Sequence, residues 1–221
     1  MAKYVMSDLH GDYKRFKGMI ELINLSNEDE LYILGDIFDR GEDSYKILDY
    51  IVGHKNIYLI KGNHEKMFEE YYETGDASLW YYNGGRKTHE QLLKSGYVMY
   101  ENIYSYIKRL PYIKVVDKFI LTHGSIVFPK GYENMTIDEF IKCQSENECL
   151  WGRSLINNER KFKDYTIICG HTPVQDICKE DVNSSILKRD GVIYIDCGCG
   201  CDFKNTKLGC LRIDDLKEFY I

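Results

Sequence analysis

Residues 35–41 form the heptad Gly35-Asp36-Ile37-Phe38-Asp39-Arg40-Gly41, in which two carboxylates and a guanidinium lie within five positions. The apolar run Leu31–Leu34 directly precedes it, so the heptad is predicted to be the polar loop at the end of a buried strand. Carboxylates this close repel one another unless a cation lies between them. The heptad is therefore either a turn with solvated charges or part of a cation site.

Two other apolar runs, Lys3–Met6 and Ile57–Ile60, also end in polar loops that contain glycine. Helical periodicity occupies the regions between the three runs, from Asp12 to Leu25 and from Ile47 to Gly53, and Asp12 is a candidate N-cap. This alternation of strand and helix predicts a parallel α/β arrangement. Because the carboxyl ends of parallel strands meet at the edge where open α/β sheets bind ligands, the three loops are expected to share a site.

The second half of the chain begins with helical signals from His64 to about Arg109, interrupted by the loop signal at residues 83–85. We predict a helical insertion, about residues 66–110, lying beside the site. Thr136–Cys143 is predicted to be a short helix. The remaining predicted strands are Tyr112–Val116, Lys118–Thr122, Tyr165–Cys169, Val192–Asp196 and Leu208–Ile213. No repeat or linker interrupts the sequence, so residues 1–221 are expected to form a single domain.

Bulk composition places the chain among ordinary globular proteins, with 44% hydrophobic and 29% charged residues in 221. A net charge of −6 offers no broad attraction to nucleic acid or to an anionic membrane. No apolar run approaches the length of a membrane span, and the first residues do not resemble a signal peptide. We therefore expect a cytoplasmic protein without nucleic-acid or membrane partners.

Four of the six histidines follow apolar runs and lie in glycine-flanked loops, whereas His54 and His89 lack this context and are expected to be structural. The four are His10, His64, His123 and His171, and the nearby polar residues are Asp8, Asp36, Asp39 and Asn63. A mixture of imidazole, carboxylate and amide ligands suits manganese, iron or zinc. The number of candidate ligands exceeds what one ion needs. We predict two ions, with Asp36 as the shared ligand.

Two metal ions about 3.5–4 Å apart can activate a water between them and stabilise both oxygens of an in-line displacement. Such a centre favours a substrate rich in negatively charged oxygen, which indicates a phosphoester. The eight cysteines are expected to be reduced thiols. The alternating Cys197, Cys199 and Cys201 are interpreted as a tight thiol-bearing turn rather than a dedicated metal site, because their spacing matches no paired zinc motif.

Five motifs resemble, as an ordered set, those of the calcineurin-like metallophosphoesterases. They are Asp8-x-His10-Gly11, Gly35-Asp36-x-x-Asp39-Arg40-Gly41, Gly62-Asn63-His64-Glu65, His123-Gly124 and Gly170-His171-Thr172. Within that group they are similar to the phosphoprotein phosphatase family, which holds Ser/Thr protein phosphatases and symmetrical dinucleoside tetraphosphatases. The resemblance extends from about Lys3 to Ile213. It implies a four-layer α-β-β-α sandwich of two mixed sheets.

The same resemblance implies a role for each motif residue. One metal ion would be held by Asp8, His10 and Asp36, and the other by Asp36, Asn63, His123 and His171. His64 would be the general acid, with its pKa raised by Asp39. Arg40 would bind the phosphoryl oxygens. Arg153, in a Trp-x-Arg motif like that of compact bacterial members, would be the second phosphoryl-binding arginine. Manganese is the first choice of metal, with iron and zinc as alternatives.

Three positions depart from the family's usual motifs: Lys61 replaces an arginine, Ser125 a smaller or apolar residue, and Cys197 the threonine of an Asp-Thr-Gly turn. None of the implied metal ligands is missing. A non-catalytic binding module on the same fold is therefore the least favoured reading. The chain is predicted to be a metal-dependent phosphatase in which a metal-bridging hydroxide attacks a phosphate monoester directly.

The predicted substrate is a phosphorylated protein or a small phosphoester, and the leading prediction is a Ser/Thr protein phosphatase. The segment from Trp80 to Arg86 resembles one in compact bacterial members of that class. The alternative is a symmetrical dinucleoside tetraphosphatase, which would stack adenine on Trp80, Tyr81 or Tyr82 and bind extra phosphates with Arg86. Packing of these aromatic residues in the protein interior is the competing interpretation. The oligomeric state is left open.

Overall fold

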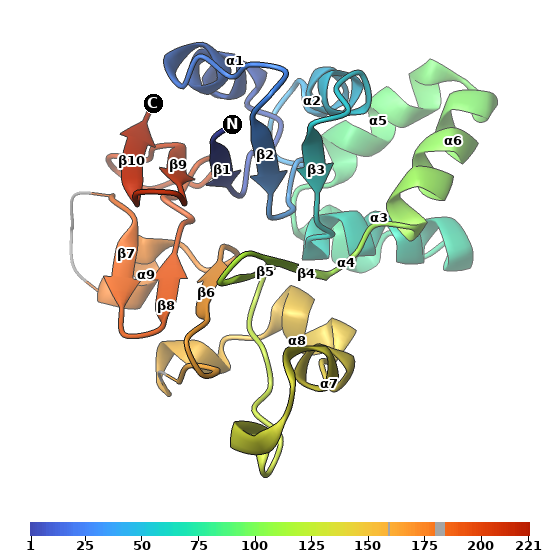
Figure 1. Ribbon diagram of the computed structural model, residues 1–221. Coiled ribbons are helices and arrows are strands. Elements are labelled where there is room, and N and C mark those ends of the chain that lie inside the picture. Colours follow the sequence, from blue (N-terminus) through green and yellow to red (C-terminus); the bar gives the residue numbers. More distant parts are fainter. Residues whose placement is uncertain (159, 180–183) are drawn as a thin grey trace.

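Two five-stranded mixed sheets pack face to face, with helices on both outer surfaces (Figure 1). This computed structural model describes residues 1–158, 160–179 and 184–221. Helices α1 (Tyr13–Leu22) and α2 (Ser44–Val52) cover the first sheet, and α7 (Ile137–Lys142) and α8 (Glu146–Trp151) lie beneath the second. The predicted α-β-β-α sandwich is confirmed.

The first sheet has the strand order β10-β9-β1-β2-β3. Strands β1 (Lys3–Met6), β2 (Glu30–Ile33) and β3 (Ile57–Leu59) are parallel, as predicted. Strand β9 (Gly209–Arg212) is antiparallel to β1, and β10 (Lys217–Tyr220) is antiparallel to β9. The carboxyl ends of the three parallel strands therefore meet at one edge.

The second sheet has the order β4-β5-β6-β8-β7. Strands β5 (Phe119–Thr122), β6 (Thr166–Cys169) and β8 (Val192–Tyr194) are parallel. Strands β4 (Ile113–Val116) and β7 (Leu187–Arg189) pair antiparallel at the two edges. The turn at Asp117, predicted to close a hairpin, joins β4 to β5, and its φ of 51° suits an aspartate.

Four helices follow β3 and lie on the right of Figure 1, beyond the sheets. They are α3 (Asn63–Thr74), α4 (Ser78–Tyr82), α5 (Arg86–Ser95) and α6 (Tyr97–Lys108). This helical segment matches the predicted one in extent. The shorter elements are α9 (Val174–Cys178) and the 3₁₀ turns Tyr132–Asn134 and Ser154–Ile156.

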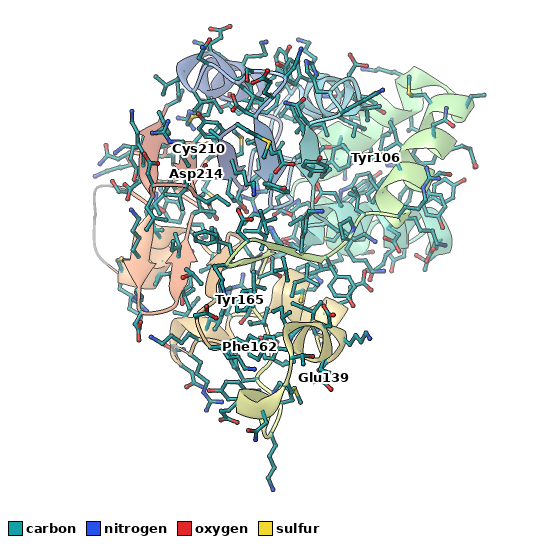
Figure 2. All side chains as sticks on the ribbon, in the orientation of Figure 1. Tyr106, Glu139, Phe162, Tyr165, Cys210 and Asp214 are labelled. Atoms are coloured by element: carbon teal, nitrogen blue, oxygen red, sulfur yellow. The ribbon has the colours of Figure 1, made fainter. Side chains whose placement is uncertain are left out.

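Side chains alternate between the two faces of each strand and so build separate hydrophobic clusters. On β1, Val5 faces the second sheet, whereas Tyr4 and Met6 pack beneath the helices of the first sheet. A third cluster, which contains Phe162, fills the space between the second sheet and its helices. Figure 2 shows Phe162 below that sheet and Cys210 within the first. Because successive side chains of β1 point to opposite faces, this strand packs both against the helices and against the second sheet.

The elements that sequence reasoning missed are short or lie at sheet edges. Strands β7 and β10 carry charged residues and are partly exposed, so they lack an apolar run. The turn with alternating glycine and cysteine does join two predicted strands, but β8 and β9 belong to different sheets. Asp12 caps α1 as predicted, accepting a hydrogen bond from the backbone of Arg15 at 2.9 Å. Within the described residues, no helix is long and apolar enough to cross a membrane.

Candidate metal centre

The loops after β1, β2, β3, β5 and β6 converge at the shared edge of the two sheets. Seven of the ten predicted site residues line a cavity of about 600 Å³ there: His10, Asp36, Arg40, Asn63, His64, Arg153 and His171. The other three, Asp8, Asp39 and His123, are buried, each with no more than 2% of its surface exposed. The structure therefore brings together residues that are up to 163 positions apart, as with Asp8 and His171.

The backbone of this region is held in conformations that side chains other than glycine rarely adopt. Six of the twelve described non-glycine residues with positive φ are predicted site residues: Asp8, His10, Asp36, Asp39, Arg40 and His171. Such conformations cost about 1–3 kcal/mol each and persist only where the surroundings enforce them. The β1 and β2 loops enforce them on each other, since the amides of Leu9 and His10 both donate to the carbonyl of Asp36 at 2.9 Å.

Asp36 lies between two sets of imidazoles. Its Oδ2 is 3.8 Å from Nε2 of His10 and 3.8 Å from Nε2 of His64, while its Oδ1 is 3.4 Å from Nε2 of His123. The donor atoms form two groups, each within 4.8 Å: His10, Asp36 and His64, and Asp36, His123 and His171. Because Asp36 belongs to both groups and offers a different oxygen to each, its geometry fits a bridging ligand.

Hydrogen bonds from two histidines to backbone carbonyls set their tautomers. Nδ1 of His10 is 3.0 Å from the carbonyl of Phe38, and Nδ1 of His123 is 2.7 Å from that of Leu34. A carbonyl can only accept, so each Nδ1 carries a proton and Nε2 is the ring nitrogen left to face the site. Burial favours this neutral form by lowering the pKa of His10 well below its ordinary value.

Asn63 provides a direct test of whether a cation fits. Its Oδ1 lies 2.8 Å from Nε2 of His123 and 3.0 Å from Nδ1 of His171. The same Nε2 of His123 is 3.4 Å from Oδ1 of Asp36, and Nε2 of His171 is buried with no hydrogen-bond partner among the described residues. Amide oxygen, carboxylate oxygen and imidazole nitrogen, all of them ligands of transition metals, therefore lie close together. The residues of the site therefore fit a metal ion between Asn63 and His123.

The pKa values of the buried carboxyl groups also favour a cation at this site. Burial raises the pKa of Asp36 well above its usual range, and the neighbouring charge of Asp8 raises it further. The same two causes raise the pKa of Asp196, which also lines the cavity. Carboxyl groups that are buried beside another carboxylate ionise readily only when a positive charge is close to them. Asp196 was not among the predicted ligands, although its place at the end of a predicted strand was a usable signal.

Asp8 contributes to the site differently from the predicted ligand set. It is buried, hydrogen-bonds to the Ser7 hydroxyl, and accepts a hydrogen bond from the backbone of His171 at 3.1 Å through Oδ2. It joins the loops of the two sheets, but it does not appear in either group of clustered donors. The first group contains His64, which the motif comparison makes the general acid, and not Asp8.

His64 and Asp39 form a buried pair, with Nδ1 and Oδ2 2.6 Å apart. Burial lowers the pKa of His64 well below its ordinary value, and Arg40 acts in the same direction. Burial also raises the pKa of Asp39 to about 7. The expected increase of the His64 pKa by Asp39 is thus outweighed by desolvation. Both shifts favour a pair with no net charge, in which two protons are shared among the two imidazole nitrogens and the carboxyl group.

The two predicted phosphate-binding arginines are exposed at the cavity. Nη2 of Arg40 is 3.5 Å from Nε2 of His64, and its Nη1 is 3.2 Å from Sγ of Cys201. Nη1 of Arg153 lies 3.5 Å from the carbonyl of Trp151. Both guanidinium groups therefore border the space in front of the clustered histidines, where an anionic group could reach them.

Glu65 is a supporting residue for which no role was predicted. It is fully buried at the start of α3. Its Oε2 accepts hydrogen bonds from the backbones of Asp36 and Gly62, both at 2.8 Å, and its Oε1 accepts one from Ile37 at 3.0 Å. One carboxylate thus ties the β2 loop to the β3 loop. Its position in the first turn of a predicted helix was the available signal.

Two of the three departures from the family motifs have clear local contacts, and the thiols lie outside the candidate metal groups of the described residues. Lys61 is buried, with its Nζ 2.6 Å from Oε2 of Glu69. The hydroxyl of Ser125 is 2.8 Å from that of Ser154. All eight cysteines are free, as predicted, and none belongs to a candidate metal group in the described part of the chain. Cys201 lines the cavity beside Arg40.

The residues considered for nucleotide binding lie away from the cavity. Trp80 is only 1% exposed, so its ring is not available to stack on a base. The guanidinium of Arg86 lies over the ring of Tyr81, 4.7 Å from its centroid. Tyr82 is 89% exposed and is not part of the cavity wall. For Trp80, the packing interpretation is correct.

Comparisons with known proteins give two kinds of relative. Over 67 residues the chain is 45% identical to the symmetrical bis(5'-nucleosyl)-tetraphosphatase of Wigglesworthia glossinidia brevipalpis, a match covering 29% of this chain and only 25% of that protein. It is 28% identical over 209 residues to serine/threonine-protein phosphatase 2 of Salmonella typhimurium, covering 90% of this chain and 88% of the relative.

A solved protein serine/threonine phosphatase from Saccharomyces cerevisiae has the same fold, with a TM-score of 0.68, 16% identity, and coverage of 100% of this chain and 79% of that one. Fold and site together define an α/β protein that gathers candidate ligands for two metal ions where two sheets meet. The family model described as calcineurin-like phosphoesterase matches residues 1–198. The chain belongs to the calcineurin-like phosphoesterase family.

Proposed function

We propose that the protein is a Ser/Thr protein phosphatase that hydrolyses phosphate monoesters at a two-metal centre. The observation that carries the proposal is the position of Asp36, whose two oxygens face separate groups of imidazoles. His10, Asp36 and the neighbouring Asp8 would hold one ion. Asp36, Asn63, His123 and His171 would hold the other. Manganese fits this donor set first, with iron and zinc as alternatives.

When bound, such a pair of ions supplies an activated water and stabilises negative charge on the phosphoryl group. Arg40 and Arg153 orient the phosphoryl oxygens from the cavity rim. The water oxygen forms a bond to phosphorus while the bond from phosphorus to the alcohol oxygen breaks. His64 gives the proton at Nε2 to that alcohol oxygen, and Asp39 holds its Nδ1. The products are the free hydroxyl and inorganic phosphate.

Two observations support a phosphoprotein over a dinucleotide as the substrate. The relative that matches along most of the chain is a Ser/Thr protein phosphatase. In addition, Arg86 and the three aromatic residues considered for adenine stacking, Trp80, Tyr81 and Tyr82, do not line the cavity. The second candidate, a symmetrical dinucleoside tetraphosphatase, is favoured by the higher local identity to such an enzyme.

The experiment compares kcat/KM for a phosphoserine peptide and for diadenosine tetraphosphate, using manganese-loaded protein. We expect the peptide to be the better substrate. The control is His64→Asn, which should keep its metal content and lose about 10²–10⁴-fold in kcat because the general acid is absent. Preference for the dinucleotide would favour the second candidate. Full activity of the His64→Asn variant would refute the assignment of the acid.

A further inference from the structure

We infer that Trp80 is a positioning residue for the proposed general acid, acting on His64 through Asp39. The inference rests on the proposed function, because it assigns Trp80 to the same proton transfer. Nε1 of Trp80 is 2.8 Å from Oδ2 of Asp39, and the same oxygen is 2.6 Å from Nδ1 of His64. An indole, a carboxylate and an imidazole therefore form a continuous chain that ends at the cavity.

The indole N–H determines the direction of this hydrogen-bond chain. Indole nitrogen is a donor only, so Oδ2 of Asp39 always acts as its acceptor. An oxygen that accepts from Trp80 is also poised to accept from Nδ1 of His64, which keeps a proton on Nδ1. Nε2 of His64 then remains the atom that faces the cavity and the substrate. Trp80 thereby sets which imidazole nitrogen exchanges its proton with the leaving group.

Packing leaves Trp80 no freedom to turn away. Its ring lies in an aromatic cluster, with centroids 5.6 Å from Phe68 and 5.3 Å from Tyr71. Gly85 packs directly against the indole, where an added Cβ would come within 2.3 Å of Cδ1 and Nε1. Only glycine at position 85 permits this contact. The N–H is consequently held in one direction, as a positioning role requires.

Two other contacts from the same segment reach the same loop. The hydroxyl of Thr88 accepts a hydrogen bond from the backbone of Asp39 at 3.0 Å, and the carbonyl of Gly84 accepts one from Arg40 at 3.3 Å. Asp39 and Arg40 have φ values of 72° and 64°, so their backbone needs such support. Residues 80–88 thus hold both Asp39, which bonds to the proposed acid His64, and Arg40, which is proposed to bind phosphate.

The test uses Trp80→Phe, which keeps an aromatic ring and removes the N–H. Aryl phosphates with poor leaving groups need a general acid, whereas 2,4-dinitrophenyl phosphate does not. For manganese-loaded protein we expect kcat for phenyl phosphate to fall about 10–100-fold, the usual cost of losing such a supporting hydrogen bond. KM should be unchanged, and kcat for 2,4-dinitrophenyl phosphate should fall by less than about threefold.

The matched control is Phe68→Leu, which alters the same aromatic cluster without touching Asp39. It should lower Tm and leave the ratio of the two kcat values unchanged.

Thr88→Val is a second test if Trp80→Phe folds poorly, and it should change the ratio in the same direction as Trp80→Phe. An equal loss on both substrates for Trp80→Phe, with His64→Asn still selective, would overturn this inference alone. A His64→Asn variant without that selectivity would overturn the proposed acid itself.

Discussion

At the scale of single residues, the site depends on side chains that each contact imidazoles from more than one loop. Asp36 turns one oxygen to His123 and the other to His10 and His64. Asn63 presents its oxygen to two imidazoles. Each residue therefore connects ligands that belong to different loops. Replacing one such side chain should weaken both halves of the centre.

Asp36→Asn tests this expectation. The amide retains one oxygen but loses the charge and the second oxygen, so the variant should bind fewer than two ions per chain. We expect kcat for the phosphoserine peptide to fall by about 100-fold or more. Losing a residue that only supports a metal ligand costs about 10–100-fold, and losing a ligand should cost at least as much. Metal content is measured by elemental analysis. Asp176→Asn, an exposed residue of the same cavity, is the control and should keep both ions. Retention of two ions by Asp36→Asn would contradict the bridging assignment.

At the scale of elements, the start of α3 holds two strand-end loops together. The helix begins with the candidate ligand Asn63 and the proposed acid His64, and Glu65 in the same turn bonds back to the β2 loop. The chain thereby positions α3 and β2 with one buried carboxylate. Stability and site geometry are coupled at this point.

Glu65→Gln should reduce the free energy of unfolding by about 1.5–3 kcal/mol. The amide nitrogen cannot accept, so at least one backbone donor loses a hydrogen bond to a charged group. Urea unfolding of the metal-free protein measures the change. Glu70→Gln, exposed on the same helix, is the control and should stay within about 0.5 kcal/mol of the parent. Equal stability of the two variants would rule out the proposed support.

At the scale of the whole molecule, two sheets contribute opposite walls of one charged site. The first sheet supplies Asp8, Asp36 and Asn63, and the second supplies His123, His171 and Asp196. Burial raises the pKa of Asp36 and Asp196 and lowers that of His10 and His171. Packing the two sheets together therefore buries ionisable groups at an electrostatic cost, and a bound cation would reduce that cost.

The pH dependence of Tm should differ between chelated and manganese-loaded protein. From about pH 4 to 6.5 two effects oppose each other. The unfolded chain binds protons at His10, His64 and His171, whose pKa values burial lowers in the folded state, whereas the folded carboxyl groups keep protons that the unfolded ones have lost. Above about pH 6.5 the unfolded chain also loses the protons of His10, His64 and His171, so their effect on stability ends. The raised pKa of Asp39, about 7, and those of Asp36 and Asp196 then make stability fall as pH rises, because the folded state holds more protons.

Chelated protein should accordingly lose more Tm between pH 6.5 and 8 than loaded protein, in which the ionised carboxylates face cations. Differential scanning calorimetry with EDTA or with manganese measures both curves. At a free metal concentration of 100 Kd, binding adds about 2.7 kcal/mol. Parallel curves would show that the raised carboxyl pKa values do not respond to the metal.

Much of the fold could be predicted because it depends on local pattern. Short apolar runs locate β1 and β5, helical periodicity locates α1, and both signals lie within a few consecutive residues. Edge strands such as β7 lack that signal because they carry charged side chains and are partly exposed. The candidate ligands were also predictable, since each follows an apolar run in a glycine-flanked loop.

The sequence by itself determined which chemical groups stand at the strand ends and that their types suit two metal ions. Only the tertiary structure decided which oxygen of Asp36 faces which imidazole, and that Trp80, 41 positions away, donates to Asp39. It also decided that desolvation, rather than Asp39, dominates the pKa of His64. The physical reason is distance along the sequence. Periodicity and residue type are properties of neighbouring residues, whereas the hydrogen bonds and burial of the site arise only when distant segments pack together.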